Sequence, residues 1–335
     1  RGPAPPPPPP PPAAPATSPA PAAPAAPSAI PTPAAVVAAA AAGPRRPAIT
    51  TAATTRNSAS AEWLSGGAAL QRVDSPVWNM MVTHVASLGR APASILDLAS
   101  GPGEPACSLA ARFPRARVTA SDIVPTMLTS ARARAKNLRL KRVQVCELDM
   151  TDLSSISTGS IDIVTVCLGL HLIPEGLQQV LGGISRVLKP GGHCVATLWD
   201  DAPLVEACLR TMQDMTGRPW SLPHDQLAHC GGRMDPLWAT AGLTPTAGHN
   251  TILAVPLNLG PIGGSSRTWW VKGPVAVLPR LANCPADELD ELKDAFRSRF
   301  RAEGLVTSRG DLELRQHCRL MSLRKGLVVV PGAAR

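Results

Sequence analysis

The feature that most constrains this sequence is a glycine-rich turn that follows a short apolar run ending in an acid. Residues 95–105 read Ile-Leu-Asp-Leu-Ala-Ser-Gly-Pro-Gly-Glu-Pro, and the residues after them can start a helix. Glycines remove side chains where a ligand has to approach the backbone. The first amides of a following helix favour a carboxylate or phosphate at the turn. The pattern therefore predicts a strand, a ligand-binding turn and a helix.

Two kinds of ligand fit such a turn. The spacing of Gly101, Gly103 and Ala106 formally matches the dinucleotide-binding fingerprint. That fingerprint also needs an acid about 20 residues further on, and Asp122 occupies such a place. Asp97 argues against a dinucleotide, because its charge would face the pyrophosphate. An acid at that position suits a cationic group, such as the ammonium of a methionine moiety.

The segment Asp97-x-Ala99-x-Gly101-x-Gly103 resembles the first motif of class I S-adenosylmethionine (SAM)-dependent methyltransferases, with Ala99 where the first glycine is usual. Ala99 would strain the loop if its φ is positive. The resemblance implies a Rossmann-like, doubly wound α/β fold. Its mostly parallel, seven-stranded sheet would have helices on both faces and a C-terminal antiparallel hairpin. The resemblance is to small-molecule enzymes of the ubiquinone/menaquinone-methyltransferase-like group, covers about residues 90–330, and weakens after Asp200.

Two further strand-like segments, residues 117–122 and residues 143–149, also end in acids. Right-handed crossovers place the carboxyl ends of parallel strands at one edge of the sheet. Asp122 is then placed to accept two hydrogen bonds from a ribose diol, and the alternative is a helix N-cap. The resemblance implies that Asp149 meets the adenine amino group and that Met150 covers the ring.

The fourth strand-like run, residues 160–167, is apolar on both faces, as expected for a buried parallel strand. It leads into a turn that contains Leu168 and His171. In the resembling family this turn passes beside the methionine end of SAM and opens into the substrate pocket. His171 is therefore a candidate general base, although methyl transfer often needs none. The alternative is a histidine bonded to backbone or packed under a lid. Residues 184–192, which end in Lys-Pro-Gly-Gly, match a further landmark of the family.

The resemblance thus implies SAM as the cofactor, with Asp97 engaging the methionine ammonium directly or through water. The implied cofactor-binding residues are Asp97, Ala99, Ser100, Gly101, Gly103, Asp122, Ile123, Asp149, Met150 and Leu168. No metal is expected. The eight cysteines lie far apart without a C-x-x-C pair, so we expect free thiols in a reducing compartment.

Residues 1–60 differ in composition from the rest of the chain. They hold 18 of the 37 prolines and four arginines with no acid, which predicts a disordered tail. The later part of the tail, rich in Ala, Ser, Thr and Arg, resembles an organelle transit peptide, for a plastid rather than a mitochondrion. The alternative is a tail without an address on a cytoplasmic protein. No stretch reaches about 18 uninterrupted apolar residues, so we expect no transmembrane span.

We expect N-terminal lid helices at residues 61–92, where Trp78, Met81 and His84 would line a pocket or simply pack in the core. The SAM-binding methyltransferase domain would cover residues 93–335, with a substrate insertion at about 258–305. Adjacent Trp269 and Trp270 lie in that insertion, and one of them could line a pocket.

The net charge of +9 includes four positive charges from the tail, and the densest remaining basic patch lies within residues 132–142. We interpret this patch as a solvated helix face with its following loop. The chain has three Phe, no Tyr and no recognisable RNA-binding motif, so we expect no nucleic-acid partner.

These observations predict a SAM-dependent methyltransferase that acts on a small organic acceptor. An O, N, S or carbon nucleophile would displace the sulfonium in line, and the protein would mainly align the reactants and exclude water. The alternatives are an NAD(P)-dependent oxidoreductase and a SAM-binding protein without catalysis. Asp97 and the Lys-Pro-Gly-Gly landmark argue against the oxidoreductase. The acceptor and the oligomeric state are left open.

Overall fold

A computed structural model describes residues 2, 76–170, 173, 176–217, 234–262 and 289–326. The chain divides into two units, Arg1–Ile49 and Thr50–Arg335, and every described residue except Gly2 belongs to the second unit. The expected tail after Gly2 and residues 61–75 of the expected lid lie outside the described residues, as do His171, Trp269 and Trp270.

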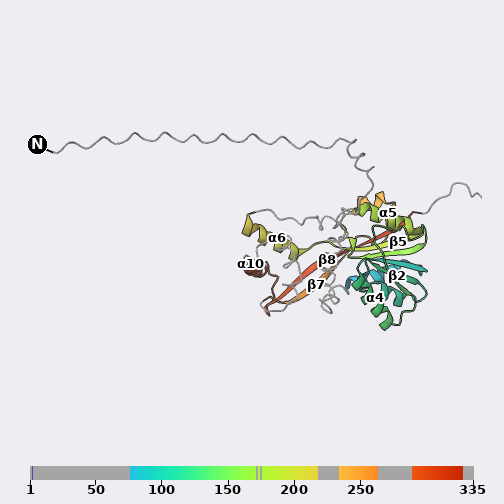
Figure 1. The fold of residues 1–335 in the computed structure, drawn as a ribbon, viewed down its shortest axis with the longest axis horizontal. Helices are drawn as coiled ribbons and strands as arrows, with labels where there is room; N and C mark the ends of the chain where they lie inside the picture. Colours follow the sequence, from blue (N-terminus) through green and yellow to red (C-terminus); the bar gives the residue numbers. More distant parts are fainter. Residues whose placement is uncertain are drawn as a thin grey trace, which may run out of the picture. The chain divides into compact units, whose positions relative to one another are not determined.

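The second unit is built on a sheet of eight strands in the order β3-β2-β1-β4-β5-β8-β6, with β7 also paired to β8 (Figure 1). Five strands are parallel: β1 (Ser94–Leu98), β2 (Arg117–Asp122), β3 (Val143–Glu147), β4 (Ile161–Cys167) and β5 (Leu188–Trp199). The antiparallel pairings involve β6 (Leu243–Pro245), β7 (Thr251–Pro261) and β8 (Asp311–Lys325). The expected Rossmann-like fold class is confirmed, and the short β6 adds one strand to the seven expected.

Helices connect the strands. They are α3 (Ala106–Arg112), α4 (Pro125–Asn137), α5 (Leu177–Val187), α6 (Pro203–Thr216), α7 (Asp235–Thr240) and α10 (Leu289–Ala302), with a further helix over residues 76–87. Apolar side chains recur at helical spacing in α5, and that stripe is buried: Leu177, Val180, Leu181, Ile184 and Val187. Within the described ranges, no helix combines the length and apolar character needed to cross a bilayer.

The sheet separates two hydrophobic clusters. Ile95 of β1 packs in one cluster with Met81 of helix 76–87 and Leu109 of α3. Its neighbour Leu96 packs in the other cluster with Leu181 of α5. Successive side chains of a strand point to opposite faces of a sheet, so β1 is buried on both sides. This burial fixes the position of the turn that follows β1.

The strand β8 belongs to two parts of the molecule. Its residues 318–324 pair with β5 and complete the main sheet, whereas residues 311–320 pair with β7. The β7–β8 end packs with α6 and α10 around Phe296 and Phe300, whose parallel rings lie 6.1 Å apart between centroids. We call this part the C-terminal arm. It contains the described part of the expected insertion, although β7 continues to Pro261, beyond the expected boundary at residue 258.

One local expectation needs correction. The third strand ends at Glu147, so Asp149 lies beyond it, in the segment that follows β3. Helix α3 begins at Ala106, directly after residues 95–105. Trp78 and Met81 take the second of the two roles expected for them: they pack in the core, on the buried side of helix 76–87.

We predict that Phe296→Ala destabilises the protein by about 3–5 kcal/mol, because Phe296 is fully buried and its removal leaves a cavity. Urea unfolding followed by circular dichroism measures the change. The matched control is Leu138→Ala at an exposed position, where we expect a change within about 0.5 kcal/mol. A similarly small change for Phe296→Ala would show that the C-terminal arm contributes little to the cooperative core.

Candidate functional site

The turn after β1 lies where the strand order of the sheet reverses. β1 pairs with β2 on one side and with β4 on the other, and all three strands are parallel. Helix α3, which follows β1, packs on one face of the sheet, whereas α5, which follows β4, packs on the opposite face. Ligands of open α/β sheets bind outside the carboxyl ends of the strands at such a switch point. The candidate site is therefore built around residues 97–103.

Asp97 is the centre of this turn and is fully buried. The Thr165 hydroxyl donates a hydrogen bond to its Oδ1 over 2.5 Å, and the Ser100 hydroxyl donates to its Oδ2. Burial raises the pKa of Asp97 to about 7. The bonds from Ser100 and Thr165 oppose that shift, and the negative charge of Glu104 adds to it. Asp97 therefore ties the end of β1 to the turn and to β4.

Three residues of the turn have positive φ: Ala99 at 52°, Gly101 at 52° and Gly103 at 101°. The strain foreseen for Ala99 is thus present, because a side chain in the left-handed region costs about 1–2 kcal/mol. Gly169, just after β4, lies against it. A Cβ atom added to Gly169 would come within 2.9 Å of the Ala99 Cβ, so the two loops touch here without room for a larger residue.

The two glycines of the turn have different surroundings. A Cβ atom on Gly103 would lie 3.1 Å from the Ala131 Cα of α4, so Gly103 allows the turn to pack against that helix. A Cβ atom on Gly101 would have nothing within 4 Å. Gly101 therefore presents open space and a bare backbone, which is what a bound ligand needs. Glu104 anchors the same turn to α4, because its Oε1 accepts a 2.8 Å ion-paired hydrogen bond from the Arg134 Nε.

Asp122, at the end of β2, links the turn to α4. Its Oδ2 accepts a hydrogen bond from the Gly101 amide, and its Oδ1 accepts one from the amide of Val124, the N-cap residue of α4; both are 2.9 Å long. Burial raises the pKa of Asp122, and these backbone amides oppose the shift. Asp122 lies two residues before the N-cap and α4 has no side-chain cap, so the helix N-cap role given as the alternative is not observed. Each carboxylate oxygen can accept a second hydrogen bond, so a ribose diol can still be held. Ile123, beside it, is half-buried.

Asp149 and Met150 lie in the turn after β3. The Asp149 Oδ1 accepts hydrogen bonds from the Thr151 amide and hydroxyl, at 2.9 and 2.7 Å. Met150 is half-buried, and its Cε atom lies 3.5 Å from the place a Cβ atom would take on Gly169. The structure thus brings Met150 to the loops that follow β1 and β4.

Leu168 also has positive φ, at 52°, directly after β4. Its amide donates to the backbone oxygen and to the hydroxyl of Thr197 on β5, at 3.1 and 3.2 Å. These bonds fix the loop after β4. The next residue of this loop, Gly169, packs against Ala99. The implied cofactor residues therefore converge at one edge of the sheet, around the ends of β1, β2 and β4 and the turn after β3.

Sequence reasoning missed the buried hydroxyls that support the site. Thr165 lies opposite Asp97 in the β1–β4 register, and Ser121 donates a 2.9 Å hydrogen bond to the Asp97 backbone oxygen. Thr197 holds Leu168 in the same way. The signal that was available for Thr165 is a single hydroxyl in the otherwise apolar second half of β4, beside a strand that contains an acid.

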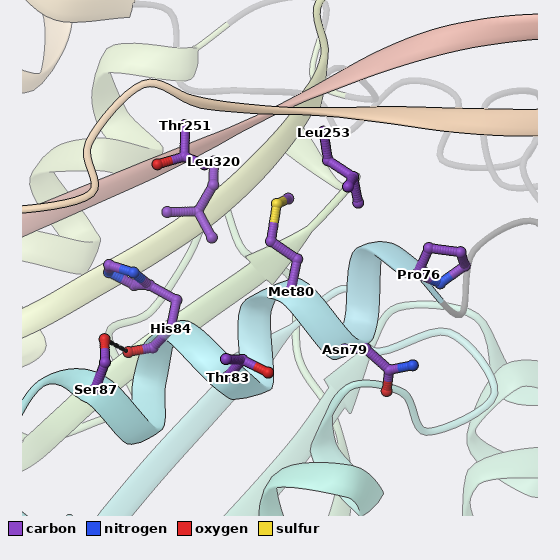
Figure 2. Close-up of a pocket in the computed structure, with 9 residues that line it drawn as sticks. All are labelled: Pro76, Asn79, Met80, Thr83, His84, Ser87, Thr251, Leu253 and Leu320. Carbon is purple, nitrogen blue, oxygen red and sulfur yellow. Dashed lines mark hydrogen bonds between the residues drawn. The ribbon is translucent and has the colours of Figure 1, made fainter.

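A cavity of about 460 Å³ lies between helix 76–87 and the β7–β8 pair, and we call it the helix groove (Figure 2). Its apolar lining residues are Pro76, Met80, Leu253 and Leu320. Its polar lining residues are Asn79, Thr83, His84, Ser87 and Thr251. The expected role of His84 in lining a pocket is thus confirmed, and Met80 lines the groove in place of Met81.

The helix groove contains no formal charge at neutral pH. His84 is the only lining residue that titrates near pH 7, and burial lowers its pKa, so it is neutral there. Its Nε2 lies 2.7 Å from the Ser322 hydroxyl, which in turn lies 2.6 Å from the Thr246 hydroxyl. These bonds fix the imidazole against β8.

The helix groove lies close to the turn after β4. Leu320 in its wall pairs with Thr197 across β8 and β5, so the two side chains share one face of the sheet. The Thr197 hydroxyl accepts a hydrogen bond from the Leu168 amide. β8 and β4 are separated by β5 alone, which corresponds to about 10 Å. A molecule of one or two rings can span that distance.

Comparison with known proteins adds independent information. Residues 95–192 match a family model described as a methyltransferase domain. A demethylmenaquinone methyltransferase from Thermus thermophilus is 36% identical over 126 residues, which cover 38% of this chain and 56% of the relative. A malonyl-acyl-carrier-protein O-methyltransferase from Laribacter hongkongensis is 36% identical over 140 residues, covering 40% of this chain and 46% of that protein. The chain therefore spans about half the length of these curated relatives.

Among solved structures, a Bacillus halodurans protein that is provisionally named a methyltransferase superposes with a TM-score of 0.50. The identity is 17%, and the match covers 74% of this chain and 98% of the other. At this level of identity the likeness concerns the fold alone.

We predict that the carboxyl of Asp97 makes the protein less stable as the pH rises from about 4 to about 7. Its folded pKa of about 7 lies above the ordinary value of 3.8, so the native state binds more protons than the unfolded state in this window. Asp97→Asn removes this titration. Urea unfolding at pH 5 and at pH 7.5 gives the free energy of unfolding at each pH. Between these two values the wild type should lose on the order of 3 kcal/mol more of that free energy than the variant does. The exposed Asp152→Asn is the control, and an equal loss in wild type and Asp97→Asn would refute the assignment.

Proposed function

We propose that this chain, whose residues 95–192 form a class I SAM-dependent methyltransferase domain, transfers a methyl group from SAM to an uncharged small organic acceptor. The observation that carries the proposal is the turn at residues 97–103. It combines open space over Gly101 with a buried acid, Asp97, at a switch point of the sheet.

The residues around this turn fit SAM chemically. When bound, SAM supplies an electrophilic methyl group on a sulfonium centre. Asp122 offers its remaining lone pairs to a ribose diol, and Asp149 offers its carboxylate to an adenine amino group. Met150 and Leu168 provide apolar surface beside them, and both are half-buried.

Asp97 contributes in two ways to this proposal. Its bonds to Ser100 and Thr165 hold the turn in the conformation that leaves the backbone of Gly101 bare. Its pKa of about 7 also makes it sensitive to a cation nearby. A positively charged ammonium favours the ionised carboxylate, so binding of SAM and deprotonation of Asp97 would support each other.

Catalysis would rest on alignment and on exclusion of water rather than on a proton-transfer group. Holding the reactants in a near-attack geometry can account for several kcal/mol of the barrier. His171 keeps its proposed role as a base for acceptors that must lose a proton.

The acceptor would bind in the helix groove. The two curated relatives described above are named for two different acceptors, demethylmenaquinone and malonyl-acyl-carrier protein. The groove has apolar walls, five hydrogen-bonding side chains and no cation to pair with a carboxylate. This lining supports an uncharged acceptor with hydroxyl or carbonyl groups on an apolar ring. Its volume of about 460 Å³ lies in the range of small-molecule sites, about 300–1,000 Å³.

We predict that S-adenosylhomocysteine raises the melting temperature of the full chain and that NADH does not. At about 100 times its dissociation constant, a ligand that binds only the native state adds about 2.7 kcal/mol of stability. Asp122→Ala should weaken the ligand by about 1–3 kcal/mol, through loss of charge-assisted hydrogen bonds. Asp122→Asn serves as a second variant that keeps the shape of the side chain, and the exposed Asp152→Ala should leave affinity unchanged. A shift with NADH alone would instead support the oxidoreductase alternative.

We predict that Thr83→Trp raises the KM for a neutral acceptor such as 1,4-naphthohydroquinone by roughly tenfold or more. The reason is that the indole would fill part of the helix groove, in which the acceptor is proposed to bind. Thr83 is exposed and lines the groove, so the variant should fold. Affinity for S-adenosylhomocysteine should not change.

The matched control is Ile252→Trp, because Ile252 is 48% exposed and lies between two groove-lining residues without lining the groove itself. Initial rates with the radiolabelled methyl donor measure the effect. Equal KM values for both variants would place the acceptor elsewhere.

A further inference from the structure

A second hollow, of about 440 Å³, lies between α4 and β3, far from the helix groove in the strand order. We call it the basic hollow. Four cationic side chains line it: Arg132, Lys136, Arg139 and Lys141. No acidic residue lines it. β3 is the first strand of the sheet order, so the hollow borders an edge strand.

The four cations form no ion pair with any residue that the structure describes. Arg132 makes only a long hydrogen bond, of 3.4 Å, to the backbone oxygen of Val145. Some cations elsewhere in the described chain have acidic partners, for example Arg134 with Glu104 and Arg319 with Asp200. The basic hollow is distinguished by having four unpaired cations around one hollow. A group of like charges without counter-charges repels itself and destabilises the fold. This arrangement is therefore better explained by an external anionic partner than by stability.

The dipole of α4 explains only part of the cluster. Cations near the carboxyl end of a helix are favourable within the last turn, which accounts for Lys136. Arg132 lies before that turn, and Lys141 lies in the loop after it. Arg139 follows the C-cap residue with φ of 56°, in a conformation for which glycine is usual. A large cation therefore occupies a strained position at the rim of the hollow.

The floor of the basic hollow is apolar. Leu140, Val143 and Val145 line it together with the four cations. Leu138, in the same loop, is 53% exposed. A nucleic acid would use the cations but gains most from aromatic side chains, and no aromatic residue lines the hollow. An acidic polypeptide segment with aliphatic side chains would use both the rim and the floor.

We propose that the basic hollow docks an extended acidic segment of a partner protein, with carboxylates on the cationic rim and a leucine-like side chain on the floor. α4 begins just after the carboxyl end of β2 and ends just before β3 starts. Its last turn therefore lies at the amino edge of the parallel strands, opposite the turn at residues 97–103. A docked partner leaves the candidate active site open, so the hollow tethers or positions the enzyme independently of its substrate.

The test is fluorescence anisotropy of the full chain with a fluorescein-labelled peptide of alternating Glu and Leu, about ten residues long. The triple variant Arg132→Glu, Lys136→Glu, Lys141→Glu should bind this peptide roughly tenfold more weakly or worse, because three charge-assisted contacts are reversed. The matched control reverses three exposed cations elsewhere: Arg301→Glu, Arg309→Glu, Arg315→Glu. It carries the same net charge and should bind like the wild type. A peptide with Ser in place of Leu should bind more weakly.

Two results would overturn the proposal. The first is equal peptide binding by the triple variant and the wild type; if the melting temperature of the triple variant is also lower, the cations only stabilise the end of α4. The second is tighter binding to single-stranded oligo-dT or to phosphatidylglycerol vesicles than to the peptide, which would assign the hollow to a nucleic acid or a membrane. An unchanged or raised melting temperature with lost binding supports the proposal.

Discussion

The candidate site depends on the burial of one carboxyl group. Asp97 is placed in the sheet by β1, which is covered on both faces, and its carboxyl is kept there by hydroxyls from Ser100 and Thr165. Removing a charge from water is costly, so these hydroxyls are needed for the arrangement to persist. The same bonds stabilise a turn in which Ala99 has an unfavourable φ. This small network of hydrogen bonds thus stabilises the conformation in which the backbone of Gly101 is accessible to a ligand.

Much of this arrangement could be predicted from local sequence. The apolar run before Asp97, the glycine spacing and the acids at residues 122 and 149 are short-range patterns, and each follows from the periodicity of strands and the needs of turns. The long-range partners could not be predicted. Thr165 is 68 residues from Asp97, and Ser322 is 238 residues from His84. Nothing local specifies such a pair, because the register of the sheet decides it. The three-residue β6 was also missed, since so short a strand has no readable alternation.

The two regions around the candidate site differ in their similarity to known proteins. The parallel strands and their turns form the part matched by the methyltransferase family model, which ends at residue 192. The C-terminal arm, with β7, α6 and α10, lies outside that match and supplies one wall of the helix groove. The match to the family model therefore covers the turn at residues 97–103 and the loop after β4, but not the β7–β8 wall of the helix groove.

The position of β8 has a consequence for the order in which the chain can fold. β8 is the last strand along the described chain, yet it lies inside the sheet between β5 and β6. During synthesis, β5 therefore presents an unpaired edge until residues 318–324 emerge from the ribosome. The contact between His84 of helix 76–87 and the Ser322 hydroxyl can likewise form only after β8 has been synthesised. Such late, long-range closure slows folding and exposes a nascent sheet to aggregation. The newly made protein would therefore depend on chaperones more than a protein of the same size whose strands pair with their neighbours in the sequence.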